Sequence, residues 1–177
     1  VAPGLELHVS TQASTTNWHT VQMWKELGAT RVVAAREVSL ADLKEMKDHV
    51  DIEIESFVHG SMCISYSGRC LLSNYMTGNR DANRGQCSQS CRWKYSLVES
   101  NRPGEYYPIE EDEHGTYIFN SKDLCLIHRI PDLYEAGIDS LKIEGRMKSV
   151  HYCATVAKVY RTAIDTYLKG GKDWYVR

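Results

Sequence analysis

The chain lacks the features that mark several large classes of protein. No apolar run approaches the roughly 20 residues that a membrane-spanning helix needs. The first residues, which begin with Val1 and not with Met, show no basic stretch followed by an apolar one, as a secretory signal would. We therefore expect a cytoplasmic protein with no membrane partner.

Three catalytic motifs are absent as well. The chain has no phosphate-binding G-x-x-x-x-G-K-[ST], no G-x-S-x-G around a nucleophilic serine and no H-E-x-x-H for a catalytic zinc ion. These absences argue against a P-loop nucleotidase, an α/β-hydrolase and a zincin-type protease.

What remains is an ordinary globular composition with a concentration of thiols. The chain has 177 residues, of which 42% are hydrophobic and 25% charged, and a formal net charge of -2. This length suffices for one domain with a buried core. Six of the residues are cysteines. In a reducing compartment, clustered thiols are metal ligands or redox groups more often than disulfide bridges.

Strand-like and helix-like apolar patterns alternate along the chain. Strands are expected at 5–9, within 30–39, at 51–57 and at 139–145, and helices at 18–27, 40–50 and 149–168. Ser39, followed three residues later by Asp42, predicts the start of the second helix, and Gly28 the end of the first. About 80 residues separate the last two strands. There we expect a hairpin of 92–100 with 116–120 and a helix around 121–137.

This order of elements predicts a parallel α/β sheet with right-handed crossovers. Four strands cannot close an eight-stranded barrel, so we expect the C-terminal half of a modified (βα)8 TIM barrel with a long Cys-rich insertion before the last strand. The barrel domain would span residues 1–168, with the insertion at about 60–138, a tail or linker at 169–177 and the N-terminal barrel half absent. A self-contained, open four-stranded sheet is the alternative.

In a barrel, the loops that follow the strands form the active face. Here these positions are mostly polar or charged: Gln12, Arg36, Glu37, Glu55, His59, Glu144 and Arg146. Packing alone does not require so polar an edge, which indicates a site.

The spacing of the cysteines distinguishes between kinds of metal site. Cys70 follows Cys63 by seven residues, Cys87 comes seventeen later and Cys125 thirty-eight after that. Zinc fingers place their ligands in pairs about two to four residues apart, and only Cys87 and Cys91 come near this spacing. Thiolates from separate segments suit the larger body of an iron–sulfur cluster.

Zinc stays open as an alternative, because His59 lies four residues before Cys63 and imidazole with thiolate is an acceptable zinc set. A structural histidine is the plainer interpretation of His59. Cys91 is either a spare ligand or a bystander. Cys153 lies on the apolar stripe of the last helix, and we expect it in the core.

The segment from Ser61 to Tyr95 is basic and aromatic. It contains one acidic residue, Asp81, and five basic ones: Arg69, Arg80, Arg84, Arg92 and Lys94. Four aromatic residues are interspersed among them in the sequence: Tyr66, Tyr75, Trp93 and Tyr95. Cations for phosphates and rings for bases favour the binding of a nucleic-acid strand. The alternative is a solvated basic face, offset by the acidic stretch "EYYPIEEDE".

Four stretches resemble closely the collagenase-like peptidase family U32: "ESFVHGSMCISYSGRCLLS", "NRGQCSQSCRWKY", "FNSKDLCL" and "GIDSLKIEGRMKS". The likeness covers nearly the whole chain and implies a modified (βα)8 barrel. The family is named for a peptidase activity of unassigned mechanism. Other members are tRNA or rRNA hydroxylation proteins, of which the tRNA type makes 5-hydroxyuridine at the wobble position and requires prephenate.

The resemblance also implies a cofactor. Related members in ubiquinone hydroxylation bind a [4Fe–4S] cluster through four cysteines spaced like Cys63, Cys70, Cys87 and Cys125, so these are the expected ligands. Cys91 and His59 are lesser candidates. Zinc shared by His and Cys across a dimer is the other option that the family offers.

The leading hypothesis is accordingly a cytoplasmic protein of RNA hydroxylation, closest to the tRNA wobble-uridine branch. Its expected partners are tRNA or rRNA, a prephenate-like carboxylate metabolite, and a second copy or a family paralogue. Arg36, Lys142 and Arg146 would bind the carboxylate or a phosphate, since cationic side chains pair with such anions. Ordinary salt bridges to glutamates are the alternative for these three.

Glu55 and His59 are the candidate catalytic residues. Two other functions stay open: a metal- or cysteine-dependent peptidase, and a non-catalytic binding module stapled by a metal. A peptidase would need a base held against its nucleophile and donors for an oxyanion, and the sequence shows neither.

Overall fold

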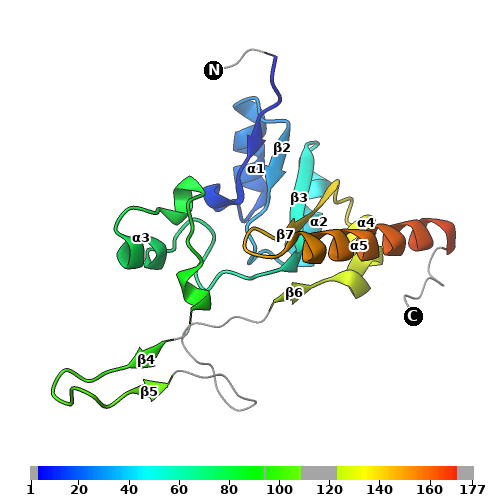
Figure 1. Ribbon diagram of the computed structural model, residues 1–177. Helices are drawn as coiled ribbons and strands as arrows, with labels where there is room; N and C mark the ends of the chain where they lie inside the picture. The colour runs from blue at the N-terminus through cyan, green and yellow to red at the C-terminus, as the bar shows by residue number, and fades with distance from the viewer. Residues whose placement is uncertain (1–3, 94, 109–122, 171–177) are drawn as a thin grey trace.

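The structure is a computed structural model that describes residues 4–93, 95–108 and 123–170. It has one main sheet with helices packed on it, which confirms the α/β class (Figure 1). Strands β1 (His8–Val9), β2 (Arg31–Val33), β3 (Glu53–Gly60) and β7 (Ser140–Glu144) run parallel. β2 lies between β1 and β3, and β3 pairs with β7. The described strands form an open sheet.

The helices alternate with these strands as the sequence predicts. They are α1 (Trp18–Glu26), α2 (Leu40–His49) and α5 (Val150–Gly170). The backbone N–H of Asp42 donates to Ser39 Oγ at 3.2 Å and that of Ser39 to Asp42 Oδ2 at 3.3 Å, which confirms the predicted helix start. No helix in these ranges is long and apolar enough to cross a membrane.

Between β3 and β7 the chain forms only short elements. In order, they are α3 (Leu72–Thr77), the 3-10 turns η2 (Ala82–Arg84) and η3 (Ser90–Arg92), the pair β4 (Ser96–Leu97) and β5 (Tyr107–Pro108), β6 (Leu124–Cys125), η4 (Ile127–Arg129) and α4 (Ile130–Glu135). A further 3-10 turn, η1 (Thr11–Ala13), follows β1. In Figure 1 the β4–β5 hairpin extends away from the main sheet.

One prediction for this segment was wrong in detail, and another falls partly outside the described residues. β4 pairs with β5, although the sequence suggested 116–120 as its partner, a stretch outside the described residues. The helix expected around 121–137 starts only at Ile130, because Leu124 and Cys125 pair instead with the end of β3 in antiparallel fashion. The final helix runs to Gly170, and 171–177 of the expected tail also lie outside the described residues.

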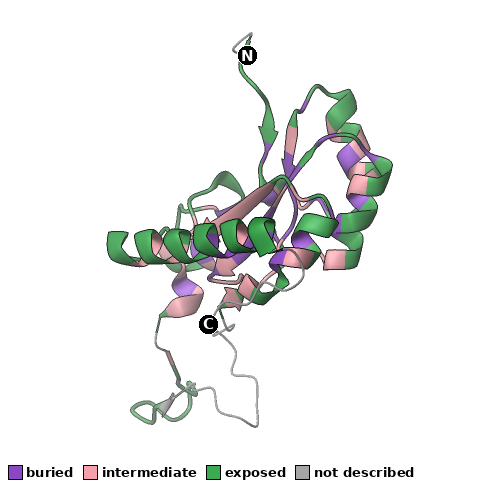
Figure 2. Cartoon of the chain, turned by 90° about the vertical axis from the view of Figure 1, so that its right-hand side faces the viewer, coloured by how far each residue is buried: buried purple, intermediate pink, exposed green. Residues whose placement is uncertain are grey.

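The core consists of apolar side chains between the sheet and its helices. Val21 of α1 and Met46 of α2 are fully buried against Val32 and Ile54 of the sheet. Each such burial contributes about 1.5–3 kcal/mol. In Figure 2 the buried residues gather where strands and helices meet, whereas the outer face of α5 is exposed.

The inner face of α5 carries Tyr160, which ties three elements together. Its hydroxyl donates to the carbonyl oxygen of Val58 on β3 at 2.7 Å and accepts the backbone N–H of Leu126 at 3.2 Å. Tyr160 is 4% exposed. The short strand β6 is therefore held at the end of β3 from the side of α5.

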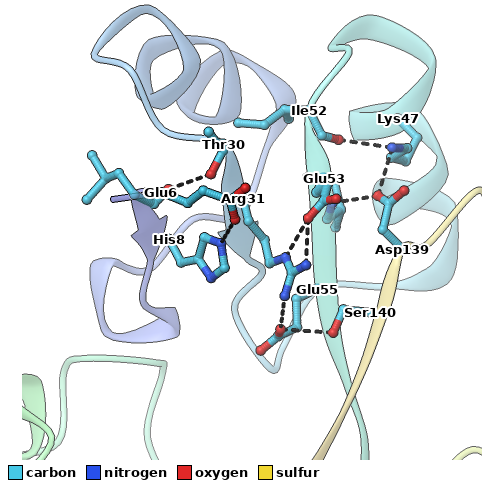
Figure 3. Close-up of polar contacts among 12 residues, drawn as sticks. Glu6, His8, Thr30, Arg31, Lys47, Ile52, Glu53, Glu55, Asp139 and Ser140 are labelled. Atoms are coloured by element: carbon cyan, nitrogen blue, oxygen red, sulfur yellow. Dashed lines mark hydrogen bonds and ion pairs between the residues drawn. The ribbon is translucent and has the colours of Figure 1, made fainter. Parts of the chain in front are cut away.

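The opposite face of the sheet is charged. Side chains alternate along a strand, so Arg31, Glu53, Glu55 and Lys142 share the face that points away from α1 and α2. Arg31 on β2 lies 2.6 Å from Glu53 and 3.4 Å from Glu55, both on β3. These ion pairs join β2 to β3 (Figure 3). A purely apolar interior would not need such pairs, so this face is built differently from the helix-covered one.

Candidate functional site

Four of the cysteines line one cavity at the carboxyl ends of the parallel strands. The cavity has a volume of about 60 Å³ and is lined by Cys63, Cys70, Cys87 and Cys91. We call it the thiol cavity. Gln12 after β1, Arg36 after β2, Ser61 after β3 and Glu144 with Arg146 at the end of β7 also line it. Four of the seven polar residues predicted at the strand ends, Gln12, Arg36, Glu144 and Arg146, thus meet at a common place, where the carboxyl ends of parallel strands lie together.

The loop that carries Cys63 and Cys70 is anchored at Ser67, which lies between them and is 1% exposed. Its backbone N–H and hydroxyl both donate to the Glu37 carboxylate, the N–H at 3.1 Å and the hydroxyl at 2.9 Å. Its oxygen in turn accepts the backbone N–H of Arg36 at 3.1 Å. These bonds fasten the first two thiols to the end of β2.

Gly68 makes the same loop approach β1 closely. Its φ is +76°, and a Cβ there would collide with the carbonyl oxygen of Gln12. Glycine is the residue that takes this conformation at little cost and leaves room for a neighbouring backbone. The loop therefore lies against η1, the turn after β1, on one side and is bonded to the residues just after β2 on the other.

Cys87 and Cys91 reach the cavity through a second set of contacts. The backbone N–H of Ser88 donates to Ser73 Oγ at 2.9 Å, and both serines are buried. Arg92, next to Cys91 on η3, donates from Nη2 to the Met62 carbonyl at 2.6 Å. This last bond connects the two cysteine-bearing segments directly.

Charge around the thiols is positive. Arg36, Arg92 and Arg146 line the cavity with one carboxylate, Glu144, among them. Burial raises the pKa of the Cys63 and Cys91 thiols, and Arg36 and Arg92 respectively oppose this rise. Guanidinium groups at these places would balance the negative charge of thiolate ligands.

The four thiols do not converge on one point. Within the described ranges, no group of three or more His, Cys, Asp or Glu side chains is placed to hold a single metal ion. A mononuclear zinc site needs about four ligands within roughly 2.0–2.3 Å of the ion. The described thiols therefore line a common cavity without forming such a ligand set.

Cys125 and His59 lie elsewhere. They face each other across the β3–β6 pair, and neither lines the thiol cavity. A β-bulge between Phe57 and His59 changes the register with β7, and the His59 ring lies beside α5, with Nδ1 3.4 Å from the Tyr160 hydroxyl. Burial lowers the pKa of His59. The nearby thiol of Cys125 is exposed.

The three candidate anion-binding cations are in different situations. Arg36 stacks over the Phe57 ring at 3.9 Å and reaches Glu144 with Nη2 at 3.3 Å, while its buried Nε has no hydrogen-bond partner in the part of the chain described. Arg146 lines the same cavity. Lys142 instead lies 2.6 Å from Glu55 on the charged sheet face. The structure thus brings two of the three together.

Glu55, a catalytic candidate from the sequence, is held in ion pairs. Burial opposes its ionisation, but hydrogen bonds from Lys142 and Ser140 outweigh this, and the pKa of Glu55 lies below its ordinary value. The Ser140 hydroxyl donates at 2.9 Å (Figure 3). Glu55 does not line the thiol cavity. It is an ionised group that joins β2, β3 and β7.

A larger cavity adjoins the thiol cavity. It has a volume of about 590 Å³ and is lined by Arg36, Glu37, Met62, Cys63, Ile64, Ser65, Tyr66 and Arg69. We call it the tyrosine cavity. Arg36, Met62 and Cys63 line both cavities. Cys63 is therefore the thiol that stands between them.

The segment that carries the cysteines also has exposed aromatic and aliphatic side chains, of which Tyr66 lines the tyrosine cavity. Tyr66, Leu71 and Tyr75 are 72%, 80% and 84% exposed. Trp93 is stacked on Tyr95 with ring centroids 6.5 Å apart. The basic residues Arg69, Arg80 and Arg84 are exposed on the same segment. Of the basic and aromatic side chains expected from the sequence, Arg92 and Tyr95 are partly buried, Lys94 lies outside the described residues, and the others are exposed.

Sequence reasoning missed two parts of this site. Phe57 supports Arg36, and Ser67 anchors the cysteine loop. For Phe57 the signal was an apolar residue on an otherwise charged strand face. Ser67 gave no signal, because a serine beside a glycine is ordinary in any loop.

Comparison with known proteins agrees with the sequence resemblance. The family model for peptidase family U32 matches residues 1–176. The chain is 54% identical over its whole length to tRNA hydroxylation protein P1 of Bacillus subtilis and 43% identical over 95% of its length to tRNA hydroxylation protein P of Escherichia coli. It is 35% identical over 97% of its length to the 23S rRNA 5-hydroxycytidine C2501 synthase of Escherichia coli.

These relatives are longer than the chain, which covers 42%, 46% and 25% of their respective lengths. No solved structure is significantly similar. The family match, however, extends over almost every residue, including the four thiols of the cavity and the loops that hold them. The chain belongs to peptidase family U32.

Proposed function

We propose that this protein takes part in tRNA hydroxylation, forming 5-hydroxyuridine at the wobble position in the cytoplasm. The observation that carries the proposal is the thiol cavity, which lies at the carboxyl edge of the sheet beside an exposed basic and aromatic surface. Two relatives at 54% and 43% identity are tRNA hydroxylation proteins by name. A surface of cations and rings suits an unpaired RNA strand.

The proposed cofactor is a [4Fe–4S] cluster. Cys63, Cys70 and Cys87, which the family spacing implies as ligands and which line the thiol cavity, would be three of its ligands. For the fourth we propose Cys91, which lines the cavity, in place of Cys125, which the spacing implies and which lies outside it. When bound, such a cluster supplies one-electron transfer. The chain's own contribution is to hold the thiols and to surround them with three guanidinium groups.

A carboxylate metabolite of the prephenate kind would bind beside the thiols. Arg36 and Arg146 are the cations available for it at the thiol cavity, and the unpartnered Nε of Arg36 is a donor without an acceptor among the described residues. Arginine recognises carboxylates through two parallel hydrogen bonds. Lys142 is less suited, because Glu55 already occupies its ammonium group.

The barrel also stays part of this proposal. Helices follow β1, β2 and β7, and the residues of the thiol cavity come from the loops after the strands, as in a (βα)8 enzyme. The remaining strands would come from the part of the longer relatives that this chain does not cover.

A cysteine peptidase is supported less. A thiol nucleophile needs a base within hydrogen-bond reach, and the thiol cavity as described has no histidine in its wall. His59 instead contacts Tyr160. Cleavage of gelatin by the purified full-length protein, abolished in Cys63→Ser, would reverse this ranking.

The test is made in cells from which the gene has been deleted. Nucleosides of their tRNA are measured by mass spectrometry, with plasmids for the wild type, Cys63→Ser and Cys153→Ser. We expect the deletion to remove 5-hydroxyuridine, and the wild type and Cys153→Ser to restore it, since Cys153 lies on α5 outside the thiol cavity. Unchanged 5-hydroxyuridine in the deletion strain would refute the proposal.

A further inference from the structure

The tyrosine cavity is large enough for a ligand of its own. Its volume of about 590 Å³ lies within the range of roughly 300–1,000 Å³ that small-molecule sites occupy. It contains three kinds of recognition group: an aromatic ring, two guanidinium groups and one carboxylate.

The aromatic group is Tyr66, which is 72% exposed although it lines a cavity. An exposed ring at the edge of a cavity offers a flat apolar face. Base stacking on such a face is one of the main sources of affinity for unpaired nucleotides.

The cations are Arg69 and Arg36. The Arg69 side chain is exposed and forms no ion pair with an acid of the described residues. Arg36 contributes its guanidinium from the wall shared with the thiol cavity. An exposed guanidinium without an acidic partner is suited to a phosphate of the backbone.

The carboxylate is Glu37, a hydrogen-bond acceptor that favours ligands with an N–H donor. The N–H and hydroxyl of Ser67 together make three contacts with the two Glu37 oxygens, and a carboxylate has about four acceptor positions, so one remains for a further N–H group. An imide or amino N–H on a base edge matches this acceptor. A free dicarboxylate has no N–H group to donate to Glu37, so this acceptor favours a nucleoside over such a metabolite.

The tyrosine cavity shares part of its wall with the thiol cavity. Cys63, Met62 and Arg36 belong to both walls. A ligand in the tyrosine cavity therefore lies against the thiol that leads into the cluster site, which is where a base to be modified must be.

We propose that the tyrosine cavity receives a single unpaired nucleoside of the RNA, with its base stacked on Tyr66, a base N–H donated to Glu37 and a backbone phosphate on Arg69. The inference rests on the proposed function and deepens it. Enzymes that modify a base take it out of its stack into such a pocket. Here the pocket is open beside the basic surface, so a loop nucleotide can enter without opening a duplex.

The first experiment locates the base. The full-length protein is mixed with an anticodon stem-loop RNA that carries 5-iodouridine at the target position, irradiated and digested with trypsin. We expect the crosslink in peptide 48–69, the tryptic fragment that contains Met62 and Tyr66. Crosslinks confined to other peptides would overturn the proposal. Because crosslinking needs no turnover, it reports on the cavity even if the protein does not hydroxylate RNA.

The second experiment measures kcat/KM for the stem-loop RNA with full-length variants. We expect Tyr66→Ala to lower it by roughly 5- to 150-fold through lost stacking, and Tyr66→Phe, which keeps the ring, to stay near the wild type. Tyr106→Ala is the matched control, since Tyr106 is 71% exposed and lies outside the cavity lining. Equal values for Tyr66→Ala and Tyr106→Ala would contradict the proposal.

The two experiments separate this inference from the proposed function. A crosslink in peptide 48–69 without any hydroxylation would leave the nucleoside site in place and remove the reaction. Hydroxylation with the crosslink elsewhere would leave the reaction and remove the site. Circular dichroism of each variant shows whether it is folded.

Discussion

The carboxylate of Glu37 holds Ser67 by both of its donors, the backbone N–H at 3.1 Å and the hydroxyl at 2.9 Å. Glu37 lies just after β2, and Ser67 lies between the first two cysteines of the thiol cavity. Through this one contact, a residue of the α/β scaffold fixes the position of the loop that carries Cys63 and Cys70.

Replacing Ser67 by alanine should loosen that loop. The Glu37 carboxylate would lose its hydroxyl donor and the partly buried Arg36 N–H its acceptor, so we expect the free energy of unfolding to fall by about 1–3 kcal/mol. Ser65→Ala is the control, because within the described part of the chain no hydrogen bond holds the Ser65 side chain, and a change away from such contacts costs less than about 0.5 kcal/mol. Urea unfolding of the full-length protein measures both, and equal losses would show that the contact is unimportant.

Glycine at position 68 should be required for space as well as for its backbone angle. Gly68 and Gly78 have nearly the same φ, +76° and +78°, but a Cβ at Gly68 meets the Gln12 carbonyl oxygen, whereas nothing lies within 4 Å of one at Gly78. Both alanine variants suffer the left-handed strain of about 1 kcal/mol. We expect Gly68→Ala to lose more stability in thermal or urea unfolding. A loss no greater than that of Gly78→Ala would mean that the β1 loop moves aside freely.

The fourth ligand of the cluster can be identified by iron and sulfide analysis after anaerobic purification of the full-length protein. On the geometry of the thiol cavity, we expect Cys91→Ser to lose most of its iron, as Cys63→Ser does, and Cys125→Ser to retain it. Cys153→Ser controls for the loss of any thiol. Retention by Cys91→Ser together with loss by Cys125→Ser would show that β6 moves to the cavity when the cluster is loaded.

His59 should make the protein less stable in mild acid. Burial lowers its pKa from the ordinary value of 6.5, with Asp123 acting in the opposite direction and Lys148 in the same one. As the pH falls below about 6.5, the unfolded chain takes up a proton before the folded one does, so stability decreases until the lowered pKa is passed and then levels off. His59→Gln should remove this part of the pH dependence. The midpoints of urea unfolding, measured between pH 7.5 and 5 for the wild type and for His59→Gln, give the difference in the pH dependence of stability.

Much of the scaffold could be predicted because its signals are local. The pair Ser39 and Asp42, a signal only four residues long, predicts the start of a helix, and the alternation of apolar and polar residues in "DIEIESF" predicts a strand. The order of these elements then indicated the α/β class. The strand ends of the sheet were found for the same reason, and Gln12, Arg36 and Arg146 do share one cavity.

The parts that escaped prediction depend on contacts between distant residues. The bulge after Phe57 turns His59 toward Tyr160, a partner 101 positions along the chain. Cys91 reaches the thiols because Arg92 bonds Met62, 30 positions earlier. No window of sequence contains both members of such a pair, so spacing alone could count thiols but could not say which of them meet.

The hydrogen bonds of the Tyr160 hydroxyl affect when the contacts around the end of β3 can form during synthesis of the chain. It joins Val58, 102 positions before it, to Leu126, 34 positions before it. On the ribosome, β3 and β6 emerge before α5, so the Tyr160 hydroxyl can join them only after α5 has left the exit tunnel. The end of β3, from which the cysteine loop departs, therefore acquires this support later than its own synthesis by more than 100 residues of chain.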